Sequence, residues 1–317
     1  MPLSRRVDSL PEAADVIADG RTVCCIGVFD GVHLGHQRLI GSAVAQARRR
    51  DKQSVVLTFR NHPLSVLAPA YAPPLLTDPA EKARRLAALR PSLVVMIPFD
   101  HAFGDQEPES FIEAVLVRQL RAVSVWCGRD FRFGREGRGD IGLLEQCGRA
   151  FGLEAHTIEP VRLRNHTVSS TWVRSLIDEG QVEQAAECMD RPHVVCGEVI
   201  AGHQRGAALG YPTANMQPPP GIVLPGDGIY AVRVQVGRRR YGGMMHVGPV
   251  PTFDIEERRF EVHLFDFSGN LLGKTVAVDF IARLRGIERF ASPDELIAQI
   301  RADERQARRV LNLDGKR

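Results

Sequence analysis

The strongest local chemical signal in this chain of 317 residues is a pair of histidines, His33 and His36, at the start of an expected helix. They belong to the segment GVFDGVHLGH (27–36), which follows an apolar run and precedes an amphipathic stretch. A helix start offers unpaired backbone N–H groups and the positive end of the helix dipole, which together favour a phosphate. Two imidazoles there could stabilise the charge that develops on a nucleotide's α-phosphate as pyrophosphate leaves.

Two other interpretations of the histidine pair carry less weight. In the first, the two residues are ordinary surface histidines beside a helix start. The HxGH spacing at a strand-to-helix junction is too specific to favour this interpretation. A zinc site is the other, and it lacks a third ligand nearby in the sequence. We therefore interpret the segment as a phosphate-binding turn.

A second phosphate-binding signal lies at Ser169, Ser170 and Thr171, which precede a short amphipathic stretch. Hydroxyls and free N–H groups at a helix start could hold the β- and γ-phosphates. Arg174 follows three residues later and could bring its charged fork toward the same phosphates. The same residues also fit a plain helix start.

These residues are carried by a regular alternation of expected strands and helices over the first 190 residues. Apolar runs at 22–28, 54–59, 93–99 and 122–128 show no polar alternation, which is typical of parallel strands buried on both faces. A fifth run lies at 154–160, and helical patterns cover 35–50, 79–89, 108–120, 141–151, 170–179 and 182–188. The pattern predicts a doubly wound, Rossmann-like α/β domain at residues 1–188.

The pattern changes near Asp190. Strand-like runs at 194–200, 229–237, 240–248, 260–267 and 274–281 follow one another without helices between them. This predicts an antiparallel β-barrel or sandwich over residues 189–317. A terminal helix is expected after Ser292, because Pro293 and Glu295 complete a helix-start signature.

Composition restricts the partners. Hydrophobic residues make up 44% and charged residues 25%, which excludes a disordered chain, a collagen and a coiled coil. A net charge of +3 predicts no nucleic-acid partner but allows a site for a small anion. No signal peptide or membrane span is recognisable, so no membrane partner is expected. The six cysteines form no CxxC pair, and we expect buried free thiols in a reducing cytoplasm.

The longer string GVFDGVHLGHQ resembles the bacterial bifunctional riboflavin kinase/FAD synthetase family, and further segments match in order over residues 20–310. Thr58-Phe59 with His62-Pro63 is similar to the family's flavin-side loop. CGRDFRFG (127–134) with GD (139–140) resembles its GxDFxFG…GD segment, and VSSTWVR (168–174) resembles its ISSTxIR motif. The resemblance implies catalytic roles for His33, His36 and Arg174. It implies nucleotide contacts from Gly27, Phe29, Asp30, Gly31, Gly35, Ser169, Ser170 and Thr171.

The flavin-side residues that the resemblance implies are Phe59, His62, Pro63, Asp130 and Phe131. Phenylalanines in such loops could bear on an isoalloxazine ring, but phenylalanines are as often simply part of a core. Asp130 could support the nucleotide or flavin, or merely form a turn.

In the second half, LGYPTAN (209–215) resembles the kinase PTAN motif and EVHLFDF (261–267) resembles its catalytic strand. The resemblance implies that Thr213 and Asn215 bind Mg²⁺ and that Glu261 accepts the proton of the flavin's 5′ hydroxyl. It also implies ATP contacts from Gly206, Gly210 and Pro212. Because Glu261 alternates with Phe260 and Val262, it could face either a site or solvent.

Several positions depart from the family pattern. In the second half they are Ala207 after Gly206, His246 and Val250 in place of Asn and Arg, Leu272 in place of Tyr, and Ile287 in place of Glu. In the first half Arg60-Asn61 stands where Asp-Pro is expected. Where a lost group made a charged hydrogen bond, each change costs about 1–3 kcal/mol of binding.

The expected function is to phosphorylate riboflavin to FMN with ATP and to adenylylate FMN to FAD with a second ATP. A second hypothesis keeps an active adenylyltransferase beside a kinase-like barrel that is inactive or altered in specificity. A third hypothesis is a flavin- or nucleotide-sensing module without turnover, which the intact His33, His36 and Arg174 argue against.

Overall fold

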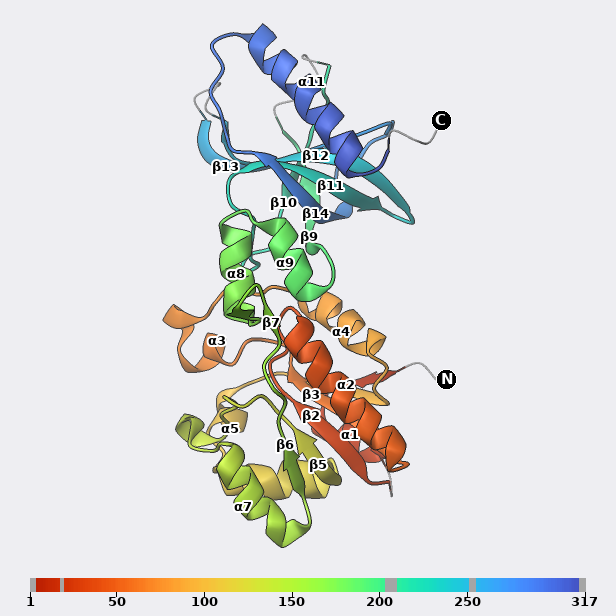
Figure 1. The fold of residues 1–317 in the computed structure, drawn as a ribbon, viewed down its shortest axis with the longest axis vertical. Coiled ribbons are helices and arrows are strands. Elements are labelled where there is room, and N and C mark those ends of the chain that lie inside the picture. Colours follow the sequence, from red (N-terminus) through yellow and green to blue (C-terminus); the bar gives the residue numbers. More distant parts are fainter. Residues whose placement is uncertain (1–3, 18–19, 203–209, 251–254, 314–317) are drawn as a thin grey trace. The chain divides into compact units, whose positions relative to one another are not determined.

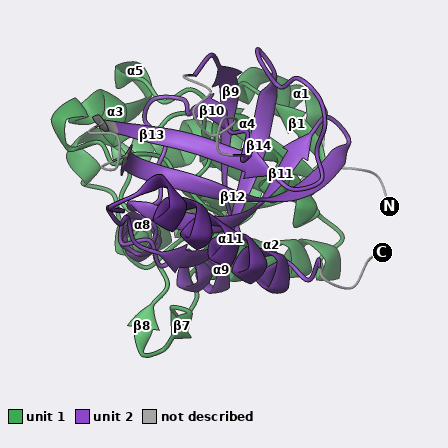
Figure 2. Cartoon of the chain, turned by 90° about the horizontal axis from the view of Figure 1, so that it is seen from above, with its two compact units in different colours: residues 1–170 green, residues 171–317 purple. Residues whose placement is uncertain are grey.

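The computed structural model describes residues 4–17, 20–202, 210–250 and 255–313. The chain forms two compact units, residues 1–170 and 171–317 (Figure 2). The predicted boundary between the two activities, after residue 188, stays a prediction. Among the helices of the described ranges, none combines the length and apolarity that a membrane crossing requires.

Unit 1 alternates strands and helices as expected from the sequence (Figure 1). Its elements are β1 (Arg5–Val7), α1 (Leu10–Ile17), β2 (Thr22–Ile26), α2 (Leu34–Arg49), β3 (Gln53–Phe59), α3 (Leu64–Leu67), η1 (Pro69–Tyr71), α4 (Pro79–Ala88), β4 (Leu93–Ile97), α5 (His101–Gly104), α6 (Pro108–Ser110), η2 (Phe111–Gln119), β5 (Ala122–Trp126), η3 (Arg135–Gly137), α7 (Ile141–Phe151), β6 (Glu154–His156), β7 (Arg162–Leu163) and β8 (His166–Thr167). The expected helix at 108–120 is α6 followed by a π-helix, η2.

Six strands of unit 1 form one parallel sheet in the order β1-β4-β3-β2-β5-β6. Every residue of β2 is buried. Cys24 and Ile26 join a core with α1, η2 and α7, whereas Val23 and Cys25 join a second core with α2 and α4. The predicted doubly wound domain is therefore confirmed, with the short edge strand β1 as an addition.

The described residues of unit 2 form two helices, a barrel and a terminal helix. Its elements are α8 (Ser170–Asp178, whose first residue closes unit 1), α9 (Val182–Met189), β9 (His193–Ile200), β10 (Ala214–Gln217), β11 (Gly228–Val236), β12 (Arg239–Val250), β13 (Ile255–Leu264), β14 (Thr275–Arg285) and α11 (Pro293–Val310). The sequence did not predict β10, which is short and follows Pro212.

The six strands of unit 2 close into an antiparallel barrel in the order β10-β13-β12-β11-β14-β9, which decides between the barrel and the sandwich. Alternate residues such as Val199, Met245 and Val262 fill its interior. On the outside, Ala307 and Leu311 at the end of α11 pack against the strands. The predicted helix start is confirmed, because the Ser292 side chain accepts a hydrogen bond from the Glu295 N–H at 3.2 Å.

Cysteine reactivity tests the described cores. None of the six cysteines is part of a disulfide. Burial raises the pKa of the Cys24 and Cys127 thiols to about 12 and that of Cys25 well above its usual value. Because the thiolate is the reactive species, these three should resist alkylation at pH 8.

In the same experiment Cys147 and Cys196, which are half-buried, should react first with iodoacetamide, as read by mass spectrometry of peptides. Urea-unfolded protein, in which all six thiols react, is the control. Equal labelling rates for Cys24 and Cys196 in the folded protein would contradict the description of the sheet core.

Candidate functional site

The turn that follows β2 lies where the strand order of the sheet reverses. The chain passes from β2 to β3 on one side, and β5 lies on the other side. In open α/β sheets, ligands bind at the carboxyl ends of the strands at such a switch point. Residues 27–33 leave the end of β2 here, and α2 begins at Leu34.

The two histidines of the turn stack on each other. His33 is the N-cap of α2, and its Nδ1 accepts a hydrogen bond from the backbone N–H of His36 at 3.4 Å. Their ring centroids are 3.6 Å apart at an interplanar angle of 22°, and the Phe29 ring meets His36 in a T-shaped contact at 5.2 Å. A Cβ on Gly35 would lie 3.1 Å from the His33 ring, so the glycine makes room for this packing.

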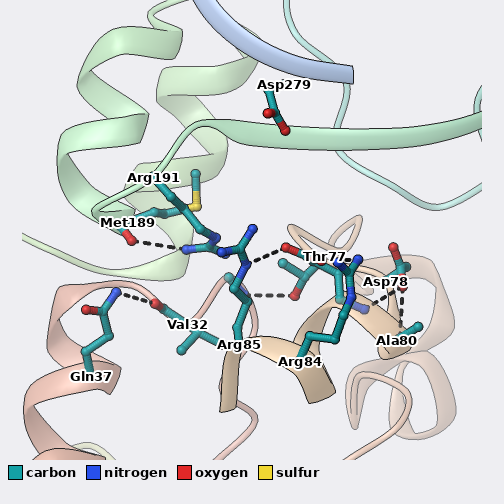
Figure 3. Close-up of polar contacts among 12 residues, drawn as sticks. Val32, Gln37, Thr77, Asp78, Ala80, Arg84, Arg85, Met189, Arg191 and Asp279 are labelled. Atoms are coloured by element: carbon teal, nitrogen blue, oxygen red, sulfur yellow. Dashed lines mark hydrogen bonds and ion pairs between the residues drawn. The ribbon is translucent and has the colours of Figure 1, made fainter. Parts of the chain in front are cut away.

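The backbone of the turn is strained. Phe29, Gly31 and Val32 have φ values of 51°, 80° and 42°. For Val32 this is unusual, because a β-branched side chain disfavours positive φ. Such strain persists only where the surroundings hold the backbone in place, and it clusters at functional sites. The Val32 carbonyl is held from within α2, where the Gln37 side chain donates to it at 3.0 Å (Figure 3).

Asp30 holds the turn from the other side. Its carboxylate is 2% exposed and accepts hydrogen bonds from the backbone N–H groups of Leu76 and Thr77 at 3.0–3.2 Å and from the Thr77 hydroxyl at 3.3 Å. The Thr77 oxygen in turn accepts from the Gly31 N–H at 3.3 Å. Asp30, predicted as a nucleotide contact, therefore bonds to residues 76–77 and supports the shape of the turn.

The start of α8 is bonded to the same turn. The Ser170 hydroxyl donates to the Asp30 carbonyl at 2.9 Å, which joins two sequence signals that lie 140 residues apart. Ser169 precedes it and is half-buried. Thr171 and Arg174 follow in α8 and belong to unit 2.

An aromatic cluster connects the two segments that were predicted to bind flavin. Phe59 is buried against Phe99 and Phe103, with ring centroids 5.1 and 5.5 Å away. Successive ring contacts lead on through Phe111 and Phe133, and Phe133 stacks on Phe131 at 5.5 Å. Phe59 thus contributes to the core, while Phe131 is half-buried and Asp130 is exposed.

The departure at Asn61 has a structural explanation. Its amide donates to the Phe99 carbonyl at 2.9 Å and accepts from the Phe99 N–H at 2.8 Å, so it joins the ends of β3 and β4. The neighbouring Arg60 pairs with Asp8 at 3.1 Å. His62 Nδ1 accepts from the Leu64 N–H at 3.2 Å, and Pro63 stands before the first residue of α3.

Unit 2 contains a cavity of about 490 Å³ between β9, β10, β13 and the loop that follows β13. Three of the predicted site residues line it: Pro212, Thr213 and Asn215. Leu272, which stands where the family has Tyr, also lines the cavity and is 56% exposed. Gly210 lies just before them with a φ of 81°. Gly206 and Ala207 fall outside the described residues.

The strand register places three polar residues side by side on the outer face of the barrel. Asn215 of β10 lies opposite Glu261 of β13, which lies opposite His246 of β12. Directly opposite residues share one face of a sheet, and Val262 faces the interior instead. Glu261 is 25% exposed and lies 3.9 Å from the Arg259 guanidinium. The carboxylate is therefore part of a polar row and not an isolated surface charge.

His246, the departure in this row, is bonded to the backbone. Its Nε2 lies 3.1 Å from the Gly248 carbonyl and 3.0 Å from the Pro249 carbonyl. Since carbonyls only accept, Nε2 carries the proton. Burial lowers the pKa of His246, so the ring is neutral near pH 7. The Val250 side chain lies outside the described part, and Ile287 is half-buried.

Thr213 and Asn215 are suited to a hard cation. Both residues line the cavity, and their side chains carry a hydroxyl and an amide oxygen. In the described ranges no cluster of three His, Cys, Asp or Glu side chains could hold a metal by itself. Mg²⁺ is a hard cation that takes oxygen ligands and is bound largely through substrate phosphates and waters, so the neutral oxygens of Thr213 and Asn215 fit it.

Comparisons with known proteins match a family model to each half of the chain. A family model described as FAD synthetase matches residues 16–172, and one described as riboflavin kinase matches residues 189–311. Proteins named bifunctional riboflavin kinase/FMN adenylyltransferase from Escherichia coli (strain K12) and Bacillus subtilis (strain 168) are 34% and 31% identical. The first match covers 99% of both chains, and the second covers 92% of this chain and 93% of the relative.

A solved structure described as a macrolide-efflux protein from Streptococcus pneumoniae has the same fold throughout. It is 32% identical, with a TM-score of 0.84, and the match covers 97% of this chain and 99% of that chain.

Replacing the capping histidine tests the geometry of the turn. His33→Ala removes the side-chain acceptor for the His36 N–H and should destabilise unit 1 by about 1 kcal/mol, the usual cost of a lost N-cap. His33→Asn restores an acceptor and should recover most of that loss. Urea unfolding followed by Trp126 fluorescence in a Trp172→Phe background reports on unit 1, and identical midpoints for the Ala and Asn variants would contradict the cap.

Proposed function

The chain belongs to the family of bifunctional riboflavin kinases/FMN adenylyltransferases, and we propose that residues 1–188 adenylylate FMN while residues 189–317, which include the barrel, phosphorylate riboflavin. The enzyme converts riboflavin and ATP to FMN and ADP, and FMN and ATP to FAD and pyrophosphate. The observation that carries the first assignment is the stacked pair His33 and His36 at the start of α2, beside a strained turn at the switch point.

In the adenylyl transfer, a phosphate oxygen of FMN attacks the α-phosphorus of ATP, and the bond to the leaving pyrophosphate breaks. His33 and His36 stabilise the charge that develops on the α-phosphate, which is where preorganised donors are most effective. Ser169, Ser170 and Thr171 hold the β- and γ-phosphates, and Arg174 neutralises them. This reaction requires no covalent enzyme intermediate.

The rest of the turn shapes the nucleotide site. Gly27 and Gly35 let the side chains of the turn pack closely at the nucleotide site, since a Cβ would lie 2.8 Å from the Phe29 ring at Gly27 and 3.1 Å from the His33 ring at Gly35. Gly31 and Asp30 fix the backbone that faces the nucleotide. The flavin lies against Phe131, Asp130, His62 and Pro63, with Phe59 supporting it from the core.

In the kinase reaction, Glu261 accepts the proton of the riboflavin 5′ hydroxyl, whose oxygen attacks the γ-phosphorus of ATP while ADP leaves. Gly210 and Pro212 approach the ATP phosphates, and the family resemblance implies the same contact for Gly206, which lies outside the described residues. Thr213 and Asn215 are the residues that would hold Mg²⁺, and the ion would supply positive charge against the ATP phosphates. The register that sets Asn215 opposite Glu261 supports this arrangement, because it brings the metal ligand and the base onto one face.

The alternative of an inactive or altered kinase-like barrel has no support from the comparisons, since the riboflavin kinase model matches residues 189–311 and the relatives are named bifunctional. The partners we propose are small flavins and MgATP, with neither nucleic acid nor membrane. The six free cysteines fit our proposal of a reducing cytoplasm as the location.

The product profile tests the two activities. With riboflavin, ATP and magnesium, the enzyme should form FMN first and FAD later, and with FMN it should form FAD and pyrophosphate directly. Chromatography of the flavins resolves the three species. Formation of FAD from FMN without any FMN from riboflavin would refute the proposed kinase site.

Glu261→Gln tests the proposed base. It keeps the size of the side chain but removes the proton acceptor, so FMN formation should fall by about 10²- to 10⁴-fold. Conversion of FMN to FAD by the same protein serves as an internal control and should be unchanged. A Glu261→Gln enzyme that phosphorylates riboflavin at the normal rate would show that Glu261 is a structural residue of the barrel.

A further inference from the structure

Lys82 is a buried cation that the functions derived above do not use. It lies on α4 and is 1% exposed. Lysine is almost never fully buried unless its charge is paired, because moving an ammonium out of water is unfavourable. Burying this ammonium therefore lowers the stability of the fold, and we looked for a function that explains it.

The Lys82 ammonium joins the ends of two neighbouring strands. Its Nζ donates to the Phe59 carbonyl at the end of β3 and to the Val28 carbonyl just after β2, the latter at 3.3 Å. The Thr58 hydroxyl also donates to the Val28 carbonyl, at 3.0 Å. Val28 is thus held by two donors immediately before Phe29, where the backbone enters the left-handed region.

The same segment of the chain holds the turn on the far side of Phe29. Leu76 and Thr77 bind the Asp30 carboxylate, and the next residue, Asp78, caps α4 by accepting from the N–H groups of Ala80 and Glu81 at 2.9 Å (Figure 3). Lys82 follows one helical turn later. Residues 76–82, which we name the α4 brace, therefore hold the strained turn at both Val28 and Asp30.

We propose that Lys82 is a positioning residue for adenylyl transfer, which fixes the nucleotide turn at Val28 relative to the flavin-side segment at Phe59. This inference rests on the proposed adenylyl-transfer site in unit 1. The two substrates must meet in line, and a misplacement of about 1 Å in such a geometry lowers the rate by about 100-fold. The ammonium also adds positive charge at the carboxyl edge of the sheet, where a triphosphate is expected to bind.

The charge on Lys82 depends on its surroundings. Burial lowers its pKa to about 8, and the opposing influence is the nearby Asp30 carboxylate. The neighbouring Glu81 pairs with Arg84 and Arg85. Lys82 is therefore mostly charged at pH 7 and loses its proton as the pH rises through about 8, so FAD formation should decline over that range.

The test is Lys82→Met in the full chain. The kcat for FAD formation from FMN should fall about 10- to 100-fold, with smaller changes in the two KM values. The kcat for FMN formation from riboflavin, measured on the same preparation, should stay within twofold. Arg84→Met, which removes an exposed cation from the same helix, should leave both reactions unchanged.

Two further variants separate positioning from folding. Lys82→Gln keeps a neutral donor and should retain more activity than Lys82→Met, while losing the decline above pH 8. Thr77→Val weakens the brace at Asp30 and should reduce FAD formation without affecting the kinase reaction, even if Lys82→Met does not fold.

The inference is overturned if Lys82→Met folds and forms FAD with the wild-type kcat. If Lys82→Met does not fold, the same result for Thr77→Val overturns it. It is also overturned if the two reactions fall together, since that indicates a general loss of structure. If the wild-type enzyme itself forms no FAD from FMN, the proposed function fails instead, and these two failures are distinguishable on the same assay.

Discussion

The backbone of the turn after β2 is the constraint on which the first site depends. Phe29 and Val32 adopt positive φ values that their side chains disfavour, and such a shape persists where surrounding groups hold the backbone in place. Asp30 and Lys82 act from opposite sides of Phe29, through contacts to residues 76–77 and to the strand ends. This turn leads into α2, where His33 caps the helix and stacks on His36 at the switch point of the sheet.

In the second unit, strand register positions the polar side chains of the site. A barrel strand alternates between interior and exterior, so a one-residue slip would bury Glu261 and expose Val262. The observed pairing keeps Val262 in the core and aligns Asn215, Glu261 and His246 across three strands. His246 fits this row as a neutral donor to the carbonyls that follow it, which gives the departure from the family pattern a defined structural role.

The sequence predicted those features that depend on local pattern. Buried apolar runs predicted the parallel strands, and the HxGH spacing predicted the helix start. Two features could not be predicted from the sequence, because they depend on contacts between distant residues. The bond between Asp30 and Thr77 spans 47 residues, and Lys82 looks like an ordinary helix lysine until the structure shows its burial. Strand β10 was missed because it is four residues long and Met216 alone in it is buried.

The most direct test of the central claim is the product profile of a His33→Ala, His36→Ala double variant supplied with riboflavin, ATP and magnesium. The account predicts that FMN accumulates at the normal rate while FAD and pyrophosphate formation are abolished, because the stacked imidazoles act only in adenylyl transfer. Normal FAD formation by this folded variant would contradict the assignment of the turn after β2 as the catalytic site.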